Sequence, residues 1–181
     1  MSSSIKELLR ETIRHANECG ALSQGELQNI IDFDPHPEYL EAMQPFCYPS
    51  EFEVHKKPDF CEFEQRLGIE LHPDIREYFS SFWSASVMTM NRKSVSQFQS
   101  NHETWLLLLT CPADLNQLAK ETQDINSELG LSGNGIWVPI ARKLDGLKLV
   151  VNNETGKVGA LGYYPIPVDV TAASICAFLT P

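Results

Sequence analysis

Lysine and arginine are absent from residues 15–55 of this 181-residue chain, although the same stretch holds eight carboxylates. Burying unpaired carboxylates is prohibitively costly, so the folded stretch must face water or a cationic partner. The formal net charge is −10, and the first 90 residues carry −9 of it. Such an excess of negative charge repels nucleic acid and anionic lipid. We therefore expect a basic protein segment as the partner, with no nucleic acid and no direct membrane insertion.

Cysteine pairs with a metal-binding or redox spacing are also missing. The five cysteines are scattered and form no CxxC motif, which is typical of a reducing cytosol rather than of a disulfide framework. The longest apolar run, residues 105–109, is far too short to cross a bilayer, and residues 1–15 are amphipathic rather than a signal peptide. We expect a cytoplasmic protein that reaches the inner face of the plasma membrane only through a protein partner.

Signatures of common active sites are missing too. The chain has no GxSxG, HExxH, GxxxxGKS/T or GxGxxG motif. The glycines between Gly130 and Gly135 follow a predicted helix and precede a predicted strand, which is the wrong order for a phosphate-binding loop. No two histidines are three or four residues apart, so no helical metal clamp is visible. We predict no catalytic residue, no metal site and no cofactor; a hydrolase that pairs Cys47 with a distant histidine is the enzymatic alternative.

Aromatic residues and prolines accompany the carboxylates of the cation-free stretch. Residues 34–50 contain four prolines and predict a long loop, and such loops are usually functional or disordered. Carboxylates beside aromatic rings are typical of a surface that binds a basic peptide, and Trp83 could add an aromatic anchor. The predicted partner-binding residues are Asp34, Glu38, Glu41, Glu51, Glu53 and Trp83. The alternative interpretation is a solvated acidic loop.

Capping signals and hydrophobic periodicity predict the secondary structure. A capping box at Ser4 and Glu7 starts the first helix, and Pro73 suits the first turn of another. Pro139 suggests an edge strand or a strand end, and Asn153 to Gly156 predict a hairpin turn. Helices are expected at residues 4–19, 23–31, 59–67, 73–83, 112–129 and 169–179, and strands at 87–90, 95–99, 105–109, 136–141, 147–152 and 157–161.

This order of elements predicts an α+β fold with a mainly antiparallel sheet flanked by helices. The chain shows no linker, so we expect a single domain over residues 1–181. Its N-terminal part, residues 1–50, is helical, proline-rich and acidic, and residues 51–181 form the α+β core.

Residues 59–85, DFCEFEQRLGIELHPDIREYFSSFWSA, resemble the opening helices of the SUKH superfamily. The proline-rich segment 45–50, the helix start at 71–75, the long helix after Pro112 and the hairpin at 150–158 follow in an order similar to that of the Syd family within it. The resemblance implies a non-enzymatic protein whose acidic surface binds basic cytosolic loops of the SecY translocon. Other SUKH proteins are immunity proteins that neutralise toxins, often basic nucleases. Because the acidic first half suits either partner, both functions remain open.

Overall fold

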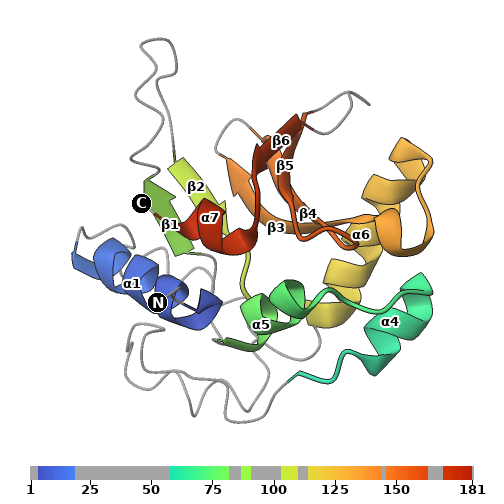
Figure 1. Ribbon diagram of the computed structural model, residues 1–181, viewed down its shortest axis with the longest axis horizontal. Coiled ribbons are helices and arrows are strands. Elements are labelled where there is room, and N and C mark those ends of the chain that lie inside the picture. Colours follow the sequence, from blue (N-terminus) through green and yellow to red (C-terminus); the bar gives the residue numbers. More distant parts are fainter. Residues whose placement is uncertain are drawn as a thin grey trace, which may run out of the picture.

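The computed structural model describes residues 4–18, 58–81, 87–90, 103–109, 114–143, 146–162 and 169–180. Within these residues, six strands form one sheet in chain order, and every neighbouring pair is antiparallel (Figure 1). This confirms the predicted α+β fold. The elements are α1 (Ile5–Glu18), α4 (Cys61–Leu67), α5 (Pro73–Ser81), β1 (Val87–Met90), β2 (Glu103–Leu106), α6 (Asp114–Leu129), the 3-10 turn η2 (Gly133–Gly135), β3 (Trp137–Lys143), β4 (Lys148–Asn152), β5 (Val158–Leu161), β6 (Asp169–Ala172) and α7 (Ile175–Leu179). The predicted helix at 23–31, loop at 34–50 and strand at 95–99 lie outside the described residues.

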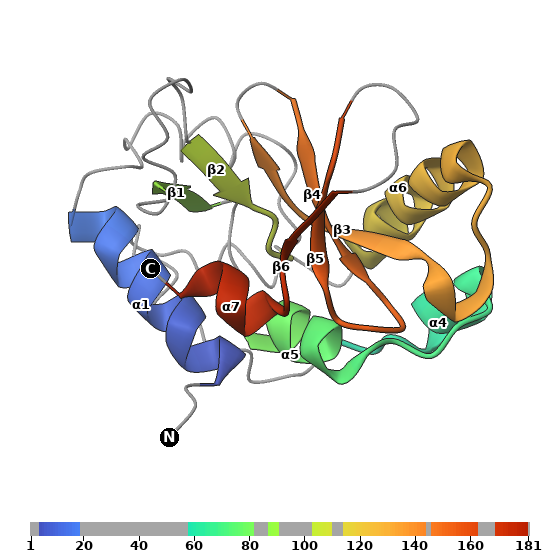
Figure 2. The same cartoon turned by 45° about the horizontal axis from the view of Figure 1, so that its top comes forward.

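The N-terminal helix α1 begins at the predicted capping box. The Ser4 hydroxyl accepts the Glu7 N–H at 3.2 Å, and the Glu7 carboxylate accepts the Ser4 N–H at 3.0 Å. Ile5 and Leu9 are buried in the main core, where each fully buried aliphatic side chain contributes about 1.5–3 kcal/mol. Figure 2 shows α1, α7 and α5 next to one another along one side of the sheet, with α6 apart from them. The helix is therefore an integral part of the core.

The central strand β4 is covered on both faces. Leu149 and Val151 pack in the main buried cluster with residues of α1 and α5, whereas Val150 packs with Ile125 of α6. Successive strand residues point to opposite faces of a sheet. The three consecutive apolar residues of β4 are thus explained by helices on both faces.

Pro139 was expected to mark an edge strand or a strand end, but β3 lies between β2 and β4 and Pro139 is its third residue. Within the sheet pairing, β2 is matched only to Ala141, Arg142 and Lys143, so it stops short of the proline. On the other side Pro139 is opposite Val150, and the register shifts between Pro139 and Ala141. A bulge is one of the few positions at which a strand tolerates proline.

Two other elements differ from the expected ones by more than two residues. The strand expected at 105–109 is β2, which begins earlier and ends at Leu106. The helix expected over 169–179 is helical only from Ile175, because residues 169–172 pair with β5 as strand β6. β-branched Val170 and Thr171 favour a strand, and the Ser174 hydroxyl caps α7 by accepting the Ala177 N–H at 3.1 Å.

None of the helices in the described part of the chain has the length and apolar character that crossing a membrane requires.

Candidate partner-binding groove

The six residues predicted from the sequence to bind a partner lie outside the described residues. They are Asp34, Glu38, Glu41, Glu51, Glu53 and Trp83. The structure therefore neither brings them together nor separates them. The candidate site consists of other residues, on the C-terminal side of that acidic stretch.

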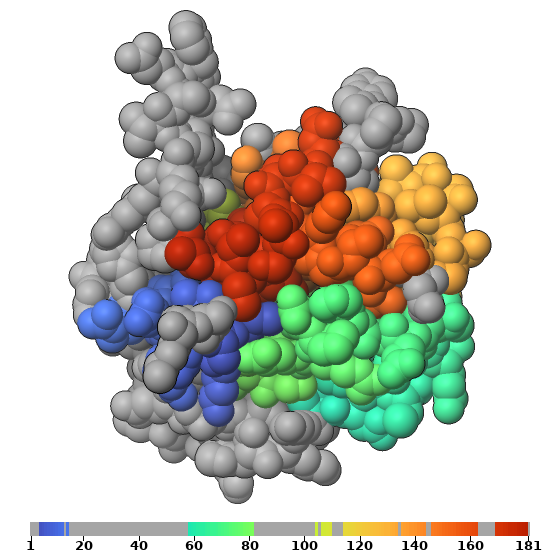
Figure 3. Space-filling model, in the orientation of Figure 1, coloured from blue at the N-terminus to red at the C-terminus, as the bar shows by residue number. Residues whose placement is uncertain are grey.

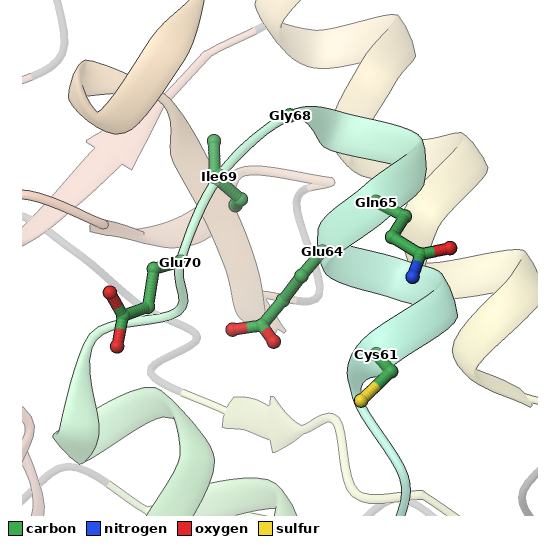
Figure 4. A pocket seen from close by; sticks show the side chains of 6 residues that line it. All are labelled: Cys61, Glu64, Gln65, Gly68, Ile69 and Glu70. Carbon is green, nitrogen blue, oxygen red and sulfur yellow. The ribbon is translucent and has the colours of Figure 1, made fainter.

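Two adjoining hollows form a groove between α4, the α4–α5 link and the β4–β5 hairpin. The outer hollow, of about 480 Å³, is lined by Cys61, Glu64, Gln65, Gly68, Ile69 and Glu70 (Figure 4). The inner hollow, of about 490 Å³, is lined by Glu70, Leu71, His72, Pro73, Arg76, Asn153 and Glu154. Because Glu70 lines both, we treat them as one feature, the hairpin groove. Figure 3 shows the orange hairpin surface against the green surface of α5 and the link.

The groove begins where α4 ends. Gly68 has a φ of 66°, a left-handed conformation that glycine adopts without strain. The Gly68 N–H donates to the Gln65 carbonyl and the Ile69 N–H donates to the Glu64 carbonyl, both in the last turn of α4. The chain then runs extended to Pro73. Burial alternates along this link, since Ile69 and Leu71 are buried while Glu70 is exposed, as expected for an extended segment with one face on the core.

Asn153, in the hairpin turn, fastens the hairpin to the link. Its side chain is buried, its Oδ1 accepts the His72 N–H at 2.9 Å, and its Nδ2 donates to the Glu70 carbonyl at 2.8 Å. Its own backbone N–H donates to the Ile136 carbonyl at 2.8 Å. A buried amide with all these groups satisfied rigidifies its surroundings.

The neighbouring Asn152 shapes the tip of the hairpin. Its Oδ1 accepts the backbone N–H groups of Glu154 and Thr155 at 3.2 and 3.0 Å and the Thr155 hydroxyl at 2.9 Å. Its Nδ2 donates to the Gly135 carbonyl at 3.1 Å. The backbone that carries Glu154 is therefore held from within the turn.

His72 joins the helix α5 to the same hairpin. Its Nδ1 accepts the Asp74 N–H at 3.2 Å, which caps the first turn of α5. A Cβ added at Gly156 would lie 2.8 Å from Cε1 of the His72 ring. The imidazole thus packs directly against the glycine, which also has a φ of 68°.

Glu64 is the partly buried carboxylate of the groove. It accepts the Leu71 N–H at 2.6 Å and forms an ion pair with Arg76. The Arg76 guanidinium also lies 5.8 Å from the centre of the Phe60 ring, within the range of a cation–π contact. Figure 4 shows the Glu64 carboxylate between α4 and the link, whereas Glu70 points away from α4. The arginine of the groove is therefore already paired within the protein.

Glu70 and Glu154 are the two carboxylates of the inner hollow. Both side chains are exposed. Within the described part of the chain neither forms an ion pair, because the pairs there involve Glu64, Glu121 and Asp74. The groove thus carries negative charge that its own cation does not neutralise.

Cys61 opens the outer hollow but is poorly suited to nucleophilic chemistry. The Asp59 carboxylate accepts the Cys61 N–H at 2.9 Å. A side-chain hydrogen bond with Asp59 and the negative charge of Asp59 raise the pKa of the Cys61 thiol. The backbone hydrogen bond from Cys61 lowers the pKa of Asp59. A thiol nucleophile needs the opposite shift, toward the thiolate. Among the described residues, no group of three His, Cys, Asp or Glu side chains is arranged to hold a metal ion.

The sequence predicted the hairpin turn and the start of α5 but not the contact between the hairpin and the link. Asn153 to Gly156 were predicted as a hairpin turn and Pro73 as a helix start. The sequence gives no local sign that Asn153 binds Glu70, which lies 83 positions away. The alternation of apolar and polar residues from Ile69 to His72 was the signal available for an extended link.

No known family model matches this chain, and no curated protein matches its sequence. The resemblance to the SUKH superfamily therefore stays a prediction.

Proposed function

We propose that this protein is a non-enzymatic binding protein for a basic segment of another protein, and that the hairpin groove is part of its binding surface. The observation that carries the proposal is the pair of exposed carboxylates, Glu70 and Glu154, which line one hollow and have no ion-pair partner among the described residues. A net charge of −10 favours the same class of partner by steering cationic segments to the protein.

The lining of the groove suits the chemistry of lysine and arginine. Pro73, which is exposed, contributes apolar surface to the hollow that holds the two carboxylates. Lysine and arginine pack their methylene stems on such surface while their charged ends reach acidic groups. The predicted binding residues Asp34, Glu38, Glu41, Glu51, Glu53 and Trp83 would extend the proposed surface along the partner.

The resemblance to the Syd family makes basic cytosolic loops of the SecY translocon the first partner to test, at the inner face of the plasma membrane. A basic toxin is the partner that the immunity alternative requires. A pull-down from native membranes and from cytosol, at low and at high salt, distinguishes the two. Recovery of the translocon supports the first partner, whereas a soluble toxin that is held tightly supports the second.

The groove itself is tested by removing its charge. The probe is a labelled peptide of alternating arginine and serine, and the variant is Glu70→Gln with Glu154→Gln. We expect each of the two substitutions to contribute a loss of about two- to fivefold in affinity, the range of exposed ion pairs. The charge-matched control is Asp124→Asn with Glu128→Gln, two exposed carboxylates of α6 outside the groove.

The control should change affinity less than about twofold, because salt screens exposed charges over roughly 8–10 Å. Binding by the wild-type protein should also weaken strongly between low and moderate salt. Equal losses in the two double variants, or an affinity that does not respond to salt, would contradict a specific acidic groove.

A further inference from the structure

Asn153 is placed to fix the geometry of the hairpin groove. The residue is 3% exposed, and its side chain bonds the carbonyl of Glu70 and the N–H of His72. These two groups flank Leu71, and bonding to the residues on either side of one position is how a parallel strand pairs with its neighbour. The amide of Asn153 therefore replaces a strand at the edge of the link.

This pairing sets the direction of the side chains along the link. Leu71 is 3% exposed and lies in the main core. In an extended segment its neighbours point the opposite way, which places Glu70 and His72 on the groove side. A second bond holds the same backbone, since the Leu71 N–H donates to Glu64 at 2.6 Å. The link cannot rotate Glu70 out of the groove without breaking these bonds.

The other carboxylate is joined to the same asparagine covalently. Glu154 follows Asn153 directly in the chain, and its N–H is held by Asn152 at 3.2 Å. The path from the Glu70 backbone to the Glu154 backbone thus contains one hydrogen bond and one short side chain.

We propose that Asn153 is the positioning residue that sets the spacing of Glu70 and Glu154, so that the groove is formed before a cationic side chain enters it. The inference rests on the proposed function, because it concerns the same groove and the same class of partner. A preformed site binds more tightly because its side chains and loops need not be ordered on binding.

Asn126 provides a matched control. It is also a buried asparagine, at 4% exposure, and it also bonds an extended backbone. Its Oδ1 accepts the Trp137 N–H and its Nδ2 donates to the Trp137 carbonyl, both at 2.8 Å. It does not line the groove. Its side-chain bonds go to Thr122 and Trp137 and not to the link or the hairpin, so we expect its replacement to disturb Glu70 and Glu154 less than replacement of Asn153 does.

The binding test is a double-mutant cycle with the arginine–serine peptide. We expect Asn153→Ala alone to weaken binding about as much as Glu70→Gln with Glu154→Gln. Added to that charge-removed background, it should weaken binding less than about twofold, since coupled residues are not additive. Asn126→Ala should leave the affinity within about twofold of the wild type. A full, additive loss on the charge-removed background, or an equal loss in Asn126→Ala, would overturn the proposal.

The second test needs no peptide. Amide hydrogen exchange of the His72 N–H should accelerate about two- to twelvefold in Asn153→Ala beyond any change in global stability, which corresponds to one hydrogen bond. It should not accelerate locally in Asn126→Ala. If Asn153→Ala fails to fold, Asn153→Ser takes its place in both tests.

The two tests separate failure of the inference from failure of the proposed function. If the wild-type protein binds no basic peptide, the proposed function fails, and the role of Asn153 in affinity fails with it. Faster His72 exchange would then show that Asn153 holds the link for a structural reason only. If the peptide binds but Asn153→Ala neither weakens binding nor loosens the His72 N–H, the positioning role alone is wrong.

Discussion

The hairpin groove and the contact between α6 and β3 each contain a buried asparagine that bonds backbone and a mostly buried carboxylate that binds a cation. They differ in the sign of the charge that is left unpaired. At the α6 contact, Asn126 bonds the backbone of β3, and Glu121 binds two cations. Its Oε2 accepts from Arg142 at 2.7 Å, and Lys148 Nζ lies 3.1 Å from Oε1. That oxygen accepts no well-aligned hydrogen bond, so the lysine contributes through charge. This cluster of Glu121, Arg142 and Lys148 therefore has one more positive than negative charge.

At the groove, Asn153 has the role that Asn126 has at the α6 contact, because it bonds an extended backbone. Glu64 corresponds to Glu121, because it is the partly buried carboxylate. Glu64 uses the arginine of this region, Arg76. Glu70 and Glu154 are then left without a paired cation among the described residues. Glu64 bonds groups of the fold, whereas Glu70 and Glu154 form no ion pair among the described residues. We therefore propose that these two carboxylates bind an external partner.

The largest effect we expect in this comparison comes from the two asparagines. Asn126→Ala should lower the free energy of unfolding by about 2–4 kcal/mol, because the partly buried N–H and C=O of Trp137 and the Thr122 carbonyl all lose a partner. Asn153→Ala should cost less, about 1–3 kcal/mol, since Glu70 and His72 lie closer to water. Urea denaturation measures both. The reverse order would show that the groove, and not α6, is the more tightly held region.

The next effect concerns the glycine under His72. Gly156→Ala and Gly130→Ala both force alanine into a left-handed conformation, at φ values of 68° and 66°, which costs about 1–2 kcal/mol. A Cβ at Gly130 meets nothing within 4 Å, whereas at Gly156 it must displace the His72 ring. We expect Gly156→Ala to lower the free energy of unfolding by about 1 kcal/mol more than Gly130→Ala, since the displaced ring no longer accepts the Asp74 N–H.

Urea denaturation gives the difference, and NMR of the His72 ring shows whether it moves. Equal costs with an unmoved ring would mean that the hairpin shifts instead, and that the two walls of the groove are not rigidly joined.

The α6 contact and the groove also differ in how well the sequence predicted them. Elements with local signals were predicted correctly, since the capping box at Ser4, the helix ends at Leu67 and Leu129 and the hairpin turn after Asn152 each depend on neighbouring residues. Such signals also place α4, α5 and α6 and give the α+β fold.

Features that depend on distant residues were missed. Pro139 is tolerated inside the sheet because of how β2 and β4 meet β3, which no window of sequence contains. Residues 169–172 are a strand because β5 is there to pair with them. The groove likewise depends on Asn153 bonding Glu70 across 83 positions. The acidic excess was visible in the composition, but the position of Glu70 and Glu154 in one hollow was not.

A smaller effect distinguishes carboxylates that serve the fold from those assigned to a partner. Glu121→Gln and Glu64→Gln should each lower the free energy of unfolding by about 1–2 kcal/mol, because both side chains are mostly buried and bind cations. Glu70→Gln and Glu154→Gln should change it by less than about 0.5 kcal/mol, as for other surface positions. Urea denaturation of the four variants tests this, and a large loss at Glu70 would mean that it serves the fold.

The smallest effect at neutral pH comes from the residue that joins the two regions. Tyr78 of α5 donates its hydroxyl proton to the Ile140 carbonyl of β3 at 2.9 Å. Ile140 also accepts the Leu107 N–H at 2.8 Å, so its carbonyl keeps a partner in Tyr78→Phe. We therefore expect a loss of only about 0.5–1.5 kcal/mol.

The same hydroxyl makes stability depend on alkaline pH. Burial raises the pKa of Tyr78 well above its usual 10.0. The unfolded chain releases this proton near pH 10 but the folded protein retains it. The stabilisation is therefore complete below pH 10 and declines as the pH rises from there toward the folded pKa, by up to about 1.4 kcal/mol for each pH unit. Urea denaturation between about pH 9 and pH 11 should show a steeper decline for the wild type than for Tyr78→Phe. Identical slopes would mean that the pKa of Tyr78 is not raised in the folded protein, and that its hydroxyl is not shielded from water between α5 and β3.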